Sequence, residues 1–122
     1  MSDLNIGIVG LGAVAGAHIE TFKHVTGARV TRVCSRREHD PADLESTYGI
    51  QLQATTRFED LLEDPDIHVI DICTPHNLHA EQAVAAAKAG KHLIIEKPMA
   101  TNFADCLRIE RAVEEAGVQA MV

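Results

Sequence analysis

Short apolar segments alternate with longer segments of helical patterning along the whole chain of 122 residues. Most of the apolar segments are rich in β-branched residues, which is typical of strands covered on both faces. The sequence predicts six such strands, at residues 4–9, 28–34, 52–54, 68–73, 92–96 and 118–122, of which 52–54 has the weakest pattern.

The segments between the strands predict five helices with recognisable ends. Asp40 is expected to be an N-cap with Pro41 at the first helical position, and Thr56 stands three residues before Glu59, the spacing of a capping box. The helices are predicted at about 13–24, 41–48, 56–64, 78–89 and 103–116. Alternation of strand and helix predicts a parallel sheet with right-handed crossovers and helices on both faces, which is a three-layer α/β/α domain.

A glycine-rich loop follows the first predicted strand and opens the first helix. In "IGIVGLGAVAG", Gly10 allows a tight turn, Gly12 lets the backbone approach a pyrophosphate, and Ala15 keeps helix and strand close. A close-packed turn without a ligand is the alternative, but the surrounding alternation favours a doubly wound dinucleotide-binding (Rossmann) fold with strand order 3-2-1-4-5-6. The loop residues expected to bind the cofactor are Gly10, Gly12, Ala13, Val14 and Ala15.

The end of the second strand carries no carboxylate for the ribose hydroxyl of NAD. Ser35, Arg36 and Arg37 occupy that place, and a hydroxyl with guanidinium groups suits the 2′-phosphate of NADP. We therefore expect NADP to be preferred, with NAD possible. The alternative is a solvated basic turn in which the arginines pair with Glu38 and Asp40.

The ends of the fourth and fifth strands should line the crevice at the point where the strand order reverses. Because the adenine half of a dinucleotide lies over the second strand, these two ends should face the nicotinamide half. The expected crevice residues are Cys73, Thr74, Pro75, His76 and Asn77 after the fourth strand, and Glu96 and Lys97 after the fifth.

Histidines near these loops do not predict a metal centre. His76 and His79 are three residues apart, but no third ligand stands nearby at useful spacing. His76 is interpreted as a crevice residue and His79 as a residue of the first helical turn. His18, on the first helix behind the glycine loop, is expected to be packed or partly exposed rather than catalytic.

Composition narrows the classes of partner and location. An apolar fraction of 46% suits one folded domain, and a net charge of −7 argues against nucleic acid or an anionic membrane surface as the main partner. No apolar run approaches the ~20 residues of a membrane helix, and the N-terminus does not have a signal-peptide pattern. The three cysteines, Cys34, Cys73 and Cys106, indicate reduced thiols in a cytoplasmic protein, a reactive thiol being the alternative.

Two stretches carry a resemblance to a known family. "IGIVGLGAVAGAHI" and "VIDICTPHNLHAEQAVAAAKAGKHLIIEKPMA", with the spacing between them, resemble the N-terminal half of the Gfo/Idh/MocA oxidoreductases, which include glucose–fructose oxidoreductase and inositol dehydrogenase. The resemblance covers essentially all 122 residues, and its "TPHNLH" and "EKP" motifs are more specific than the glycine loop.

This resemblance implies a dehydrogenase or reductase that uses NAD or NADP on a hydroxyl of a sugar, cyclitol or related polyol. It implies that Lys97 is catalytic and reaches the nicotinamide ribose and the substrate hydroxyl. It further implies that Glu96 orients the local network, that Pro98 follows a cis peptide bond and contributes to the cofactor site, and that Thr74–Asn77 contact the cofactor.

The resemblance also implies a second α/β domain that supplies the substrate pocket, the usual proton-transfer residues and most subunit contacts. Because the chain stops inside the strand-like segment 118–122, we expect residues 1–122 to be the cofactor-binding domain of a longer, homo-oligomeric enzyme, inactive as an isolated fragment. One alternative is a non-catalytic module that binds or senses a dinucleotide. Another is that Glu96 and Lys97 merely pair with each other as surface ions.

Overall fold

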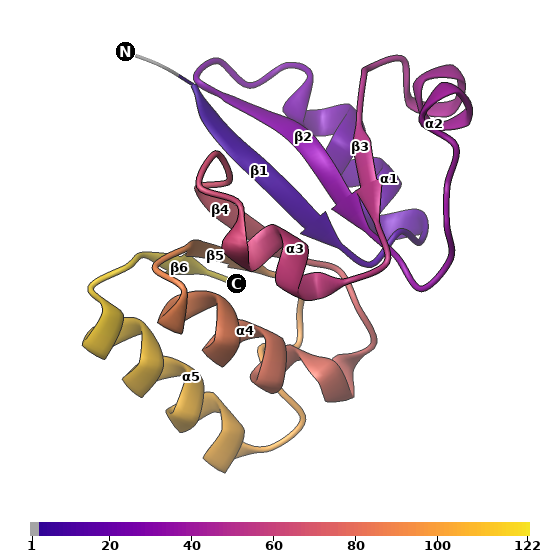
Figure 1. The fold of residues 1–122 in the computed structure, drawn as a ribbon. Coiled ribbons are helices and arrows are strands. Elements are labelled where there is room, and N and C mark those ends of the chain that lie inside the picture. The colour runs from indigo at the N-terminus through magenta and orange to yellow at the C-terminus, as the bar shows by residue number, and fades with distance from the viewer. Residues whose placement is uncertain (1–2) are drawn as a thin grey trace.

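A computed structural model describes residues 3–122, and its six strands form one parallel sheet in the order β3-β2-β1-β4-β5-β6 (Figure 1). The strands are β1 Leu4–Val9, β2 Ala28–Cys34, β3 Gln53–Thr55, β4 Val69–Ile72, β5 His92–Ile95 and β6 Ala120–Met121. The helices are α1 Ala13–Phe22, α2 Pro41–Tyr48, α3 Phe58–Glu63, α4 His79–Lys88 and α5 Phe103–Ala116, and a single 3-10 turn spans His76–Leu78. The predicted fold class and strand order are confirmed.

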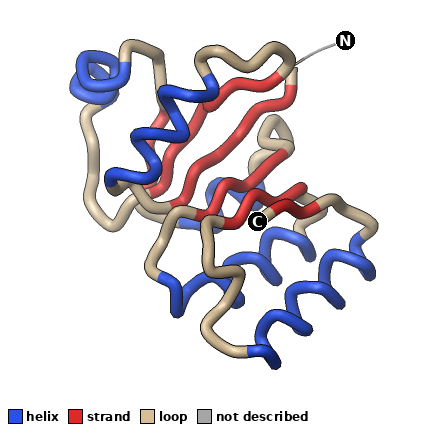
Figure 2. Tube along the Cα trace, turned by 180° about the vertical axis from the view of Figure 1, so that it is seen from behind, coloured by secondary structure: helices blue, strands red, loops and turns tan. Residues whose placement is uncertain are grey.

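Two apolar cores fill the space between the sheet and the helix layers. On one face, Ile8 of β1 packs with Ile19 of α1 and with α2, which together cover the half of the sheet that contains β1–β3 (Figure 2). On the other face, Ile70 of β4 and Ile95 of β5 pack with α3, α4 and α5. The alternation of side chains along each strand thus divides the apolar residues between the two faces. None of the helices in residues 3–122 is long and apolar enough to cross a membrane.

The helix ends agree with the sequence signals except at α3. The Asp40 carboxylate accepts a 2.8 Å hydrogen bond from the backbone N–H of Ala42 and caps α2, as predicted. The predicted capping box that begins at Thr56 is wrong, because the N-cap of α3 is Arg57 and has no side-chain cap. β3 runs to Thr55, one residue further than predicted, and the Thr55 hydroxyl instead accepts from the N–H of Arg57 at 3.1 Å.

Backbone hydrogen bonds bring the carboxyl ends of four strands into one row. The N–H of Gly10 donates to Cys34 O at 2.9 Å, which joins the ends of β1 and β2. The N–H of Cys73 donates to Val9 O at 2.8 Å, and the N–H of Glu96 donates to Ile72 O at 3.0 Å. The glycine loop, the Ser35 turn, the Thr74 loop and the Lys97 loop therefore emerge from the same edge of the sheet.

Candidate dinucleotide-binding site

Gly10 makes the tight turn between β1 and the loop that leads to α1. Its φ is +91°, and an added Cβ would lie 2.6 Å from the carbonyl oxygen of Cys73. Both the left-handed backbone and this close approach to the end of β4 require glycine. Ala15, in the first turn of α1, is fully buried against the sheet, so a larger residue would separate helix and strand.

Gly12 is the N-cap of α1 and faces open space. An added Cβ there would meet no atom within 4 Å, although the residue lies at the mouth of the row of strand ends. No side chain caps α1, and its first turn contains no acidic residue. Free backbone N–H groups and the positive end of the helix dipole are therefore directed to an open cradle, which fits a pyrophosphate. Ala13 and Val14 of this turn are exposed.

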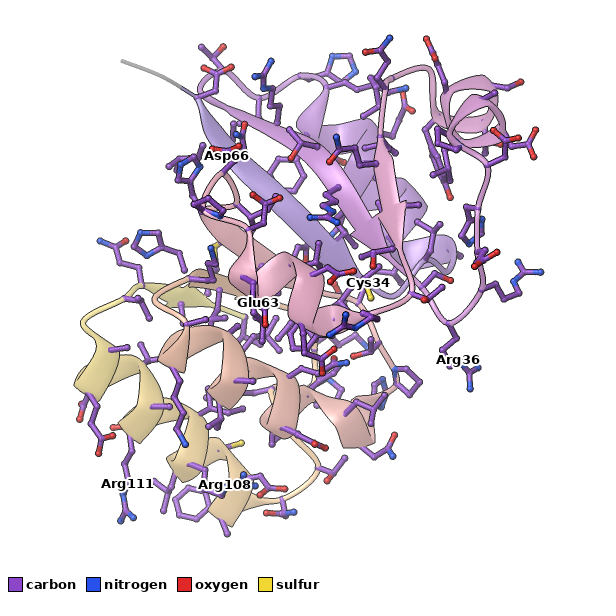
Figure 3. All side chains as sticks on the ribbon, in the orientation of Figure 1. Cys34, Arg36, Glu63, Asp66, Arg108 and Arg111 are labelled. Atoms are coloured by element: carbon purple, nitrogen blue, oxygen red, sulfur yellow. The ribbon has the colours of Figure 1, made fainter. Side chains whose placement is uncertain are left out.

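The turn after β2 is held by Ser35 and leaves its arginines free. The Ser35 hydroxyl accepts from the N–H of Arg37 and lies 3.3 Å from Nε2 of His39. Arg36 and Arg37 are exposed and form no ion pair within the described part of the chain, and Figure 3 shows Arg36 at the tip of the loop, pointing into solvent. The alternative in which they pair with Glu38 and Asp40 is not what the structure has, so both guanidinium groups remain available to an anion.

The loop after β4 presents its polar residues to solvent on a firm base. The Thr74 hydroxyl donates to Oε1 of Gln82 in α4 at 2.6 Å. Pro75, His76 and Asn77 are exposed beyond it and lead through the 3-10 turn into α4. The loop thus lies at the carboxyl edge of the sheet, with three exposed residues at its tip.

His79 links this loop to the Lys97 loop. Its ring is fully buried, with Nδ1 2.8 Å from Pro98 O and Nε2 2.9 Å from Thr74 O. The prediction placed His79 in the first turn of the helix but missed this link. Because both ring nitrogens contact backbone carbonyls, His79 fixes the spacing between two loops and has no nitrogen left for a metal.

The segment after β5 presents Lys97 to solvent. The Lys97–Pro98 peptide bond is cis, as the resemblance implied. Lys97 is exposed and forms no ion pair with a described residue, so the alternative that it merely pairs with Glu96 is wrong. Glu96 contacts His18 instead, with 3.1 Å between Oε2 and Nε2. The ammonium group is therefore free to meet a ligand at this edge.

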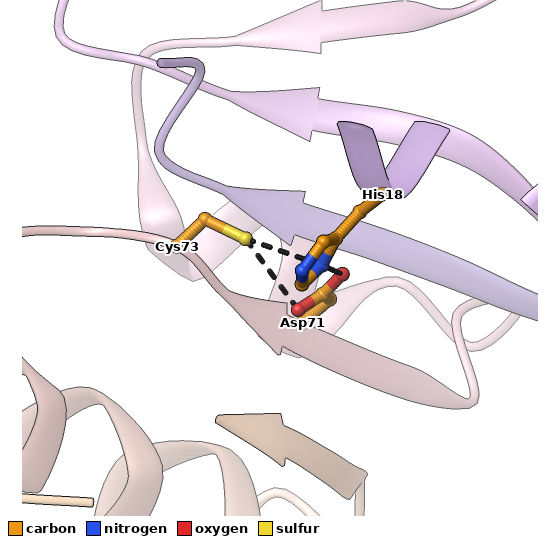
Figure 4. A group of neighbouring side chains, drawn as sticks. All are labelled: His18, Asp71 and Cys73. Atoms are coloured by element: carbon orange, nitrogen blue, oxygen red, sulfur yellow. Dashed lines mark hydrogen bonds and ion pairs between the residues drawn. The ribbon is translucent and has the colours of Figure 1, made fainter. Parts of the chain in front are cut away.

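His18, Asp71, Cys73 and Glu96 form a hydrogen-bonded cluster beneath the loops, which the sequence did not reveal. Nδ1 of His18 lies 2.6 Å from Oδ2 of Asp71, and the Cys73 thiol donates to Oδ1 of Asp71 at 3.5 Å (Figure 4). Asp71 is completely buried, whereas the side chains of His18 and Glu96 are 23% and 30% exposed. The cluster joins α1, β4 and the end of β5.

The environment shifts three pKa values in this cluster upward. Burial would lower the pKa of His18, but the hydrogen bond and charge of Asp71, with those of Glu96, outweigh burial and raise it above 6.5. Burial raises the pKa of Asp71, partly offset by His18. Burial and the neighbouring Asp71 carboxylate raise the pKa of the Cys73 thiol far above its ordinary range. All three groups therefore retain protons more strongly than they would in water.

The same cluster contains a possible set of metal ligands. One ligand atom from each of His18, Asp71 and Cys73 lies within 4.8 Å of the others. The hydrogen bonds among these atoms already account for their approach, and a strongly raised thiol pKa opposes the thiolate that zinc prefers. The sequence-based expectation of no metal stays a prediction.

A hollow of about 600 Å³ lies away from all of these residues. It is lined by the amino-end side of the sheet and by α2, including Asn5, Thr31 and Asp66. None of the predicted site residues borders it. In doubly wound sheets, ligands bind outside the carboxyl ends of the strands, so the open edge with Gly12 is the better candidate.

A parallel sheet between two layers of helices, with a glycine loop at the point where the strand order reverses, defines a dinucleotide-binding Rossmann domain. Residues 4–122 match the Gfo/Idh/MocA model, described as an oxidoreductase family with an NAD-binding Rossmann fold. The chain belongs to this family, which confirms the resemblance seen in the sequence.

Named relatives agree on the fold and the redox class but differ in substrate. Levoglucosan dehydrogenase of Pseudarthrobacter phenanthrenivorans is 34% identical over 130 residues, which cover 100% of this chain and 33% of that protein. The WlbA dehydrogenase of Chromobacterium violaceum, solved with NADH and UDP-GlcNAcA, has a TM-score of 0.89 at 27% identity, covering 100% of this chain and 35% of that one. Biliverdin reductase of Synechocystis, solved with biliverdin and NADP+, has a TM-score of 0.84 at 28% identity, covering 96% and 36%.

The chain spans about a third of the length of the curated relatives that it matches. Solved relatives contain NADH or NADP+, so membership in the family indicates an NAD(P)-type cofactor but does not distinguish the two.

Proposed function

We propose that this chain binds NAD or NADP and is the cofactor domain of an oxidoreductase that acts on a hydroxyl or carbonyl group of a sugar, cyclitol or related small molecule. The observation that carries the proposal is the open cradle at Gly12, where an uncapped helix N-terminus meets the row of strand ends. Levoglucosan dehydrogenase and the WlbA dehydrogenase support the substrate class.

Three groups of residues are proposed to hold three parts of the cofactor. The loop Gly10–Ala15 binds the pyrophosphate, the Ser35–Arg37 turn binds the adenine ribose, and the two loops over β4 and β5 bind the nicotinamide ribose. When bound, the nicotinamide ring supplies hydride chemistry. Cys73–Asn77 border this end, while Glu96 and Pro98 hold the segment of Lys97, which positions or polarises the substrate oxygen.

NADP is the proposed preference. The turn after β2 offers two exposed guanidinium groups without a carboxylate partner, and the Ser35 hydroxyl stands beside them. A 2′-phosphate there gains charge-assisted hydrogen bonds, whereas the ribose hydroxyl of NAD finds no acidic acceptor. Because water screens exposed arginines, we expect a preference of about tenfold rather than an absolute selection.

The remaining two thirds of the length seen in relatives is proposed to supply the substrate pocket, the general base and most contacts of a homo-oligomer. Residues 1–122 alone then bind the cofactor weakly and do not turn over substrate, because nothing excludes water from the nicotinamide end. The three free cysteines support a reducing compartment, the cytoplasm.

Calorimetric titration of wild type and of the variant Gly12→Val, each with NADP and with NAD, tests the proposal. The wild-type chain should bind both cofactors, with NADP tighter, and Gly12→Val should bind neither while its circular dichroism remains unchanged. An added Cβ at this position meets no atom within 4 Å, so a branched side chain is expected to occupy the cradle rather than clash with the fold. A wild-type chain that binds neither cofactor, or a variant that binds as well as wild type, would remove the assignment.

A further inference from the structure

We propose that His18 is a positioning residue for the nicotinamide end of the site, because a proton shared with Asp71 lets it hold Glu96, and with it the Lys97 segment, against α1. This inference rests on the proposed function, since it assigns a further residue to the same site. Figure 4 shows the base of this arrangement, in which the side chains of Asp71 and Cys73 turn toward His18 on the helix that follows the glycine loop.

The geometry connects segments that are distant in sequence. His18 is 53 residues from Asp71 and 78 residues from Glu96, yet its two ring nitrogens contact one carboxylate each, at 2.6 and 3.1 Å. One side chain thus joins the phosphate-binding helix to the middle of β4 and to the residue that precedes Lys97. Loss of the contact with Glu96 would remove this side-chain link between the helix and the Lys97 segment.

The two contacts of His18 with carboxylates need one more proton than a neutral histidine has. Ionised carboxylates only accept hydrogen bonds, and a neutral imidazole has a single N–H. Both contacts of His18 are satisfied if the additional proton is on Nδ1 or on Asp71, and in either case Nε2–H donates to Glu96. The raised pKa values of His18 and Asp71 agree with such retention.

The consequence for Lys97 follows from what holds its neighbours. The N–H of Glu96 is bonded to Ile72 O and its carboxylate to His18, so the residue before Lys97 is held at two points. The residue after it, Pro98, is held through its carbonyl by His79. A lysine side chain is long and flexible, so the fixed backbone limits where the ammonium group can reach.

Other titratable groups do not replace this proton. The groups that face His18 are Asp71 from β4, Cys73 directly after β4 and Glu96 directly after β5. The thiol of Cys73 is a neutral donor to Asp71 and is 3.6 Å from Nδ1 of His18. Removing the shared proton at high pH therefore leaves one carboxylate contact of His18 unmade.

The test compares NADP with 2′-phospho-ADP, which keeps the 2′-phosphate and the pyrophosphate but lacks the nicotinamide ribose and the nicotinamide ring. Wild type, His18→Gln and the matched control His24→Gln, which changes an exposed histidine near the end of the same helix, are titrated by calorimetry at pH 6.5. We expect His18→Gln to weaken the binding of NADP about tenfold, the typical effect of losing one charged contact, and to leave the binding of 2′-phospho-ADP within about twofold. His24→Gln should change neither affinity.

Equally weaker binding of both ligands by His18→Gln would overturn the inference, because it indicates a general role of His18 in the fold. Unchanged binding of both ligands would overturn it as well. If wild type binds neither ligand, the proposed function itself has failed. If His18→Gln does not fold, a second experiment tests the inference. The ring resonances of His18 are followed by NMR as a function of pH in wild type and in Glu96→Gln. The ring resonances of wild type should report loss of the shared proton with a midpoint above pH 6.5, and at lower pH in Glu96→Gln; a wild-type midpoint at or below 6.5 would also overturn the inference.

Discussion

Substitutions at three glycines distinguish a residue that the fold requires from a residue that ligand binding requires. Gly10 and Gly27 both have a φ near +90°, but an added Cβ meets the end of β4 only at Gly10 and meets no atom within 4 Å at Gly27. Gly12 has an ordinary φ of −96° and open space. We predict that Gly10→Ala damages the fold, that Gly27→Ala does so mildly, and that Gly12→Val damages only dinucleotide binding.

The magnitudes follow from these contacts. A left-handed backbone costs a residue with a side chain about 1–2 kcal/mol, which is the whole expected effect of Gly27→Ala. Gly10→Ala adds a Cβ 2.6 Å from Cys73 O and 2.9 Å from Thr74 N, and such overpacking typically costs about 1–3 kcal/mol more. The total for Gly10→Ala is therefore about 2–5 kcal/mol, whereas a poorer N-cap in Gly12→Val costs about 1 kcal/mol at most.

Urea unfolding of the four proteins measures these differences. With a denaturant slope of about 2 kcal/mol per molar, the midpoint should fall by about 1–2.5 M for Gly10→Ala and by about 0.5–1 M for Gly27→Ala. If Gly10→Ala is no worse than Gly27→Ala, the close approach between the glycine loop and β4 does not constrain the loop. If Gly12→Val destabilises as much as Gly10→Ala, its loss of binding says nothing about a phosphate cradle.

Three further predictions concern charge. In the complete enzyme, Lys97→Ala should lower turnover by ~10²–10⁴-fold and cofactor affinity only about tenfold; normal turnover on the native substrate would make Lys97 a structural ion. Ser35→Asp should reverse the preference for NADP, by adding a ribose acceptor and repelling the phosphate; dissociation constants for both cofactors at fixed salt check this, and tighter NAD binding by wild type would refute it. Because the pKa of His18 is raised above 6.5 on folding, its stabilising effect is complete below that pH and is lost as pH rises through the raised value, so urea unfolding should show a decline in stability that His18→Gln removes. A wild type equally stable across this range would contradict the last prediction.

The strand order and the row of loops followed from the sequence because they depend on local patterns. Apolar runs, the glycine spacing and cap residues such as Asp40 each act within a few residues, and the topology of alternating strands and helices follows from them. Errors appeared where one residue of register decides the partner. Thr55 rather than Thr56 supports the start of α3, because β3 lies one residue later than its weak pattern suggested.

The contacts of the cluster and of His79 required the third dimension. His18 meets partners 53 and 78 residues away, and no periodicity in sequence connects them. Asp71 was the one available signal, since a carboxylate in the buried strand segment "VIDIC" needs a partner. The identity of that partner could not be read from the sequence, because the expected topology placed several histidines near Asp71.

The central claim, that a dinucleotide binds at the carboxyl edge of the sheet, is tested most directly by NMR. Amide resonances of the ¹⁵N-labelled chain are followed as NADP is added. The largest shifts should fall on Gly10–Ala15, Ser35–Arg37, Thr74–Asn77 and Glu96–Lys97, which meet only in the folded protein. Shifts centred instead on the hollow at the opposite edge, at Asn5, Thr31 and Asp66, or no shifts at all, would contradict it.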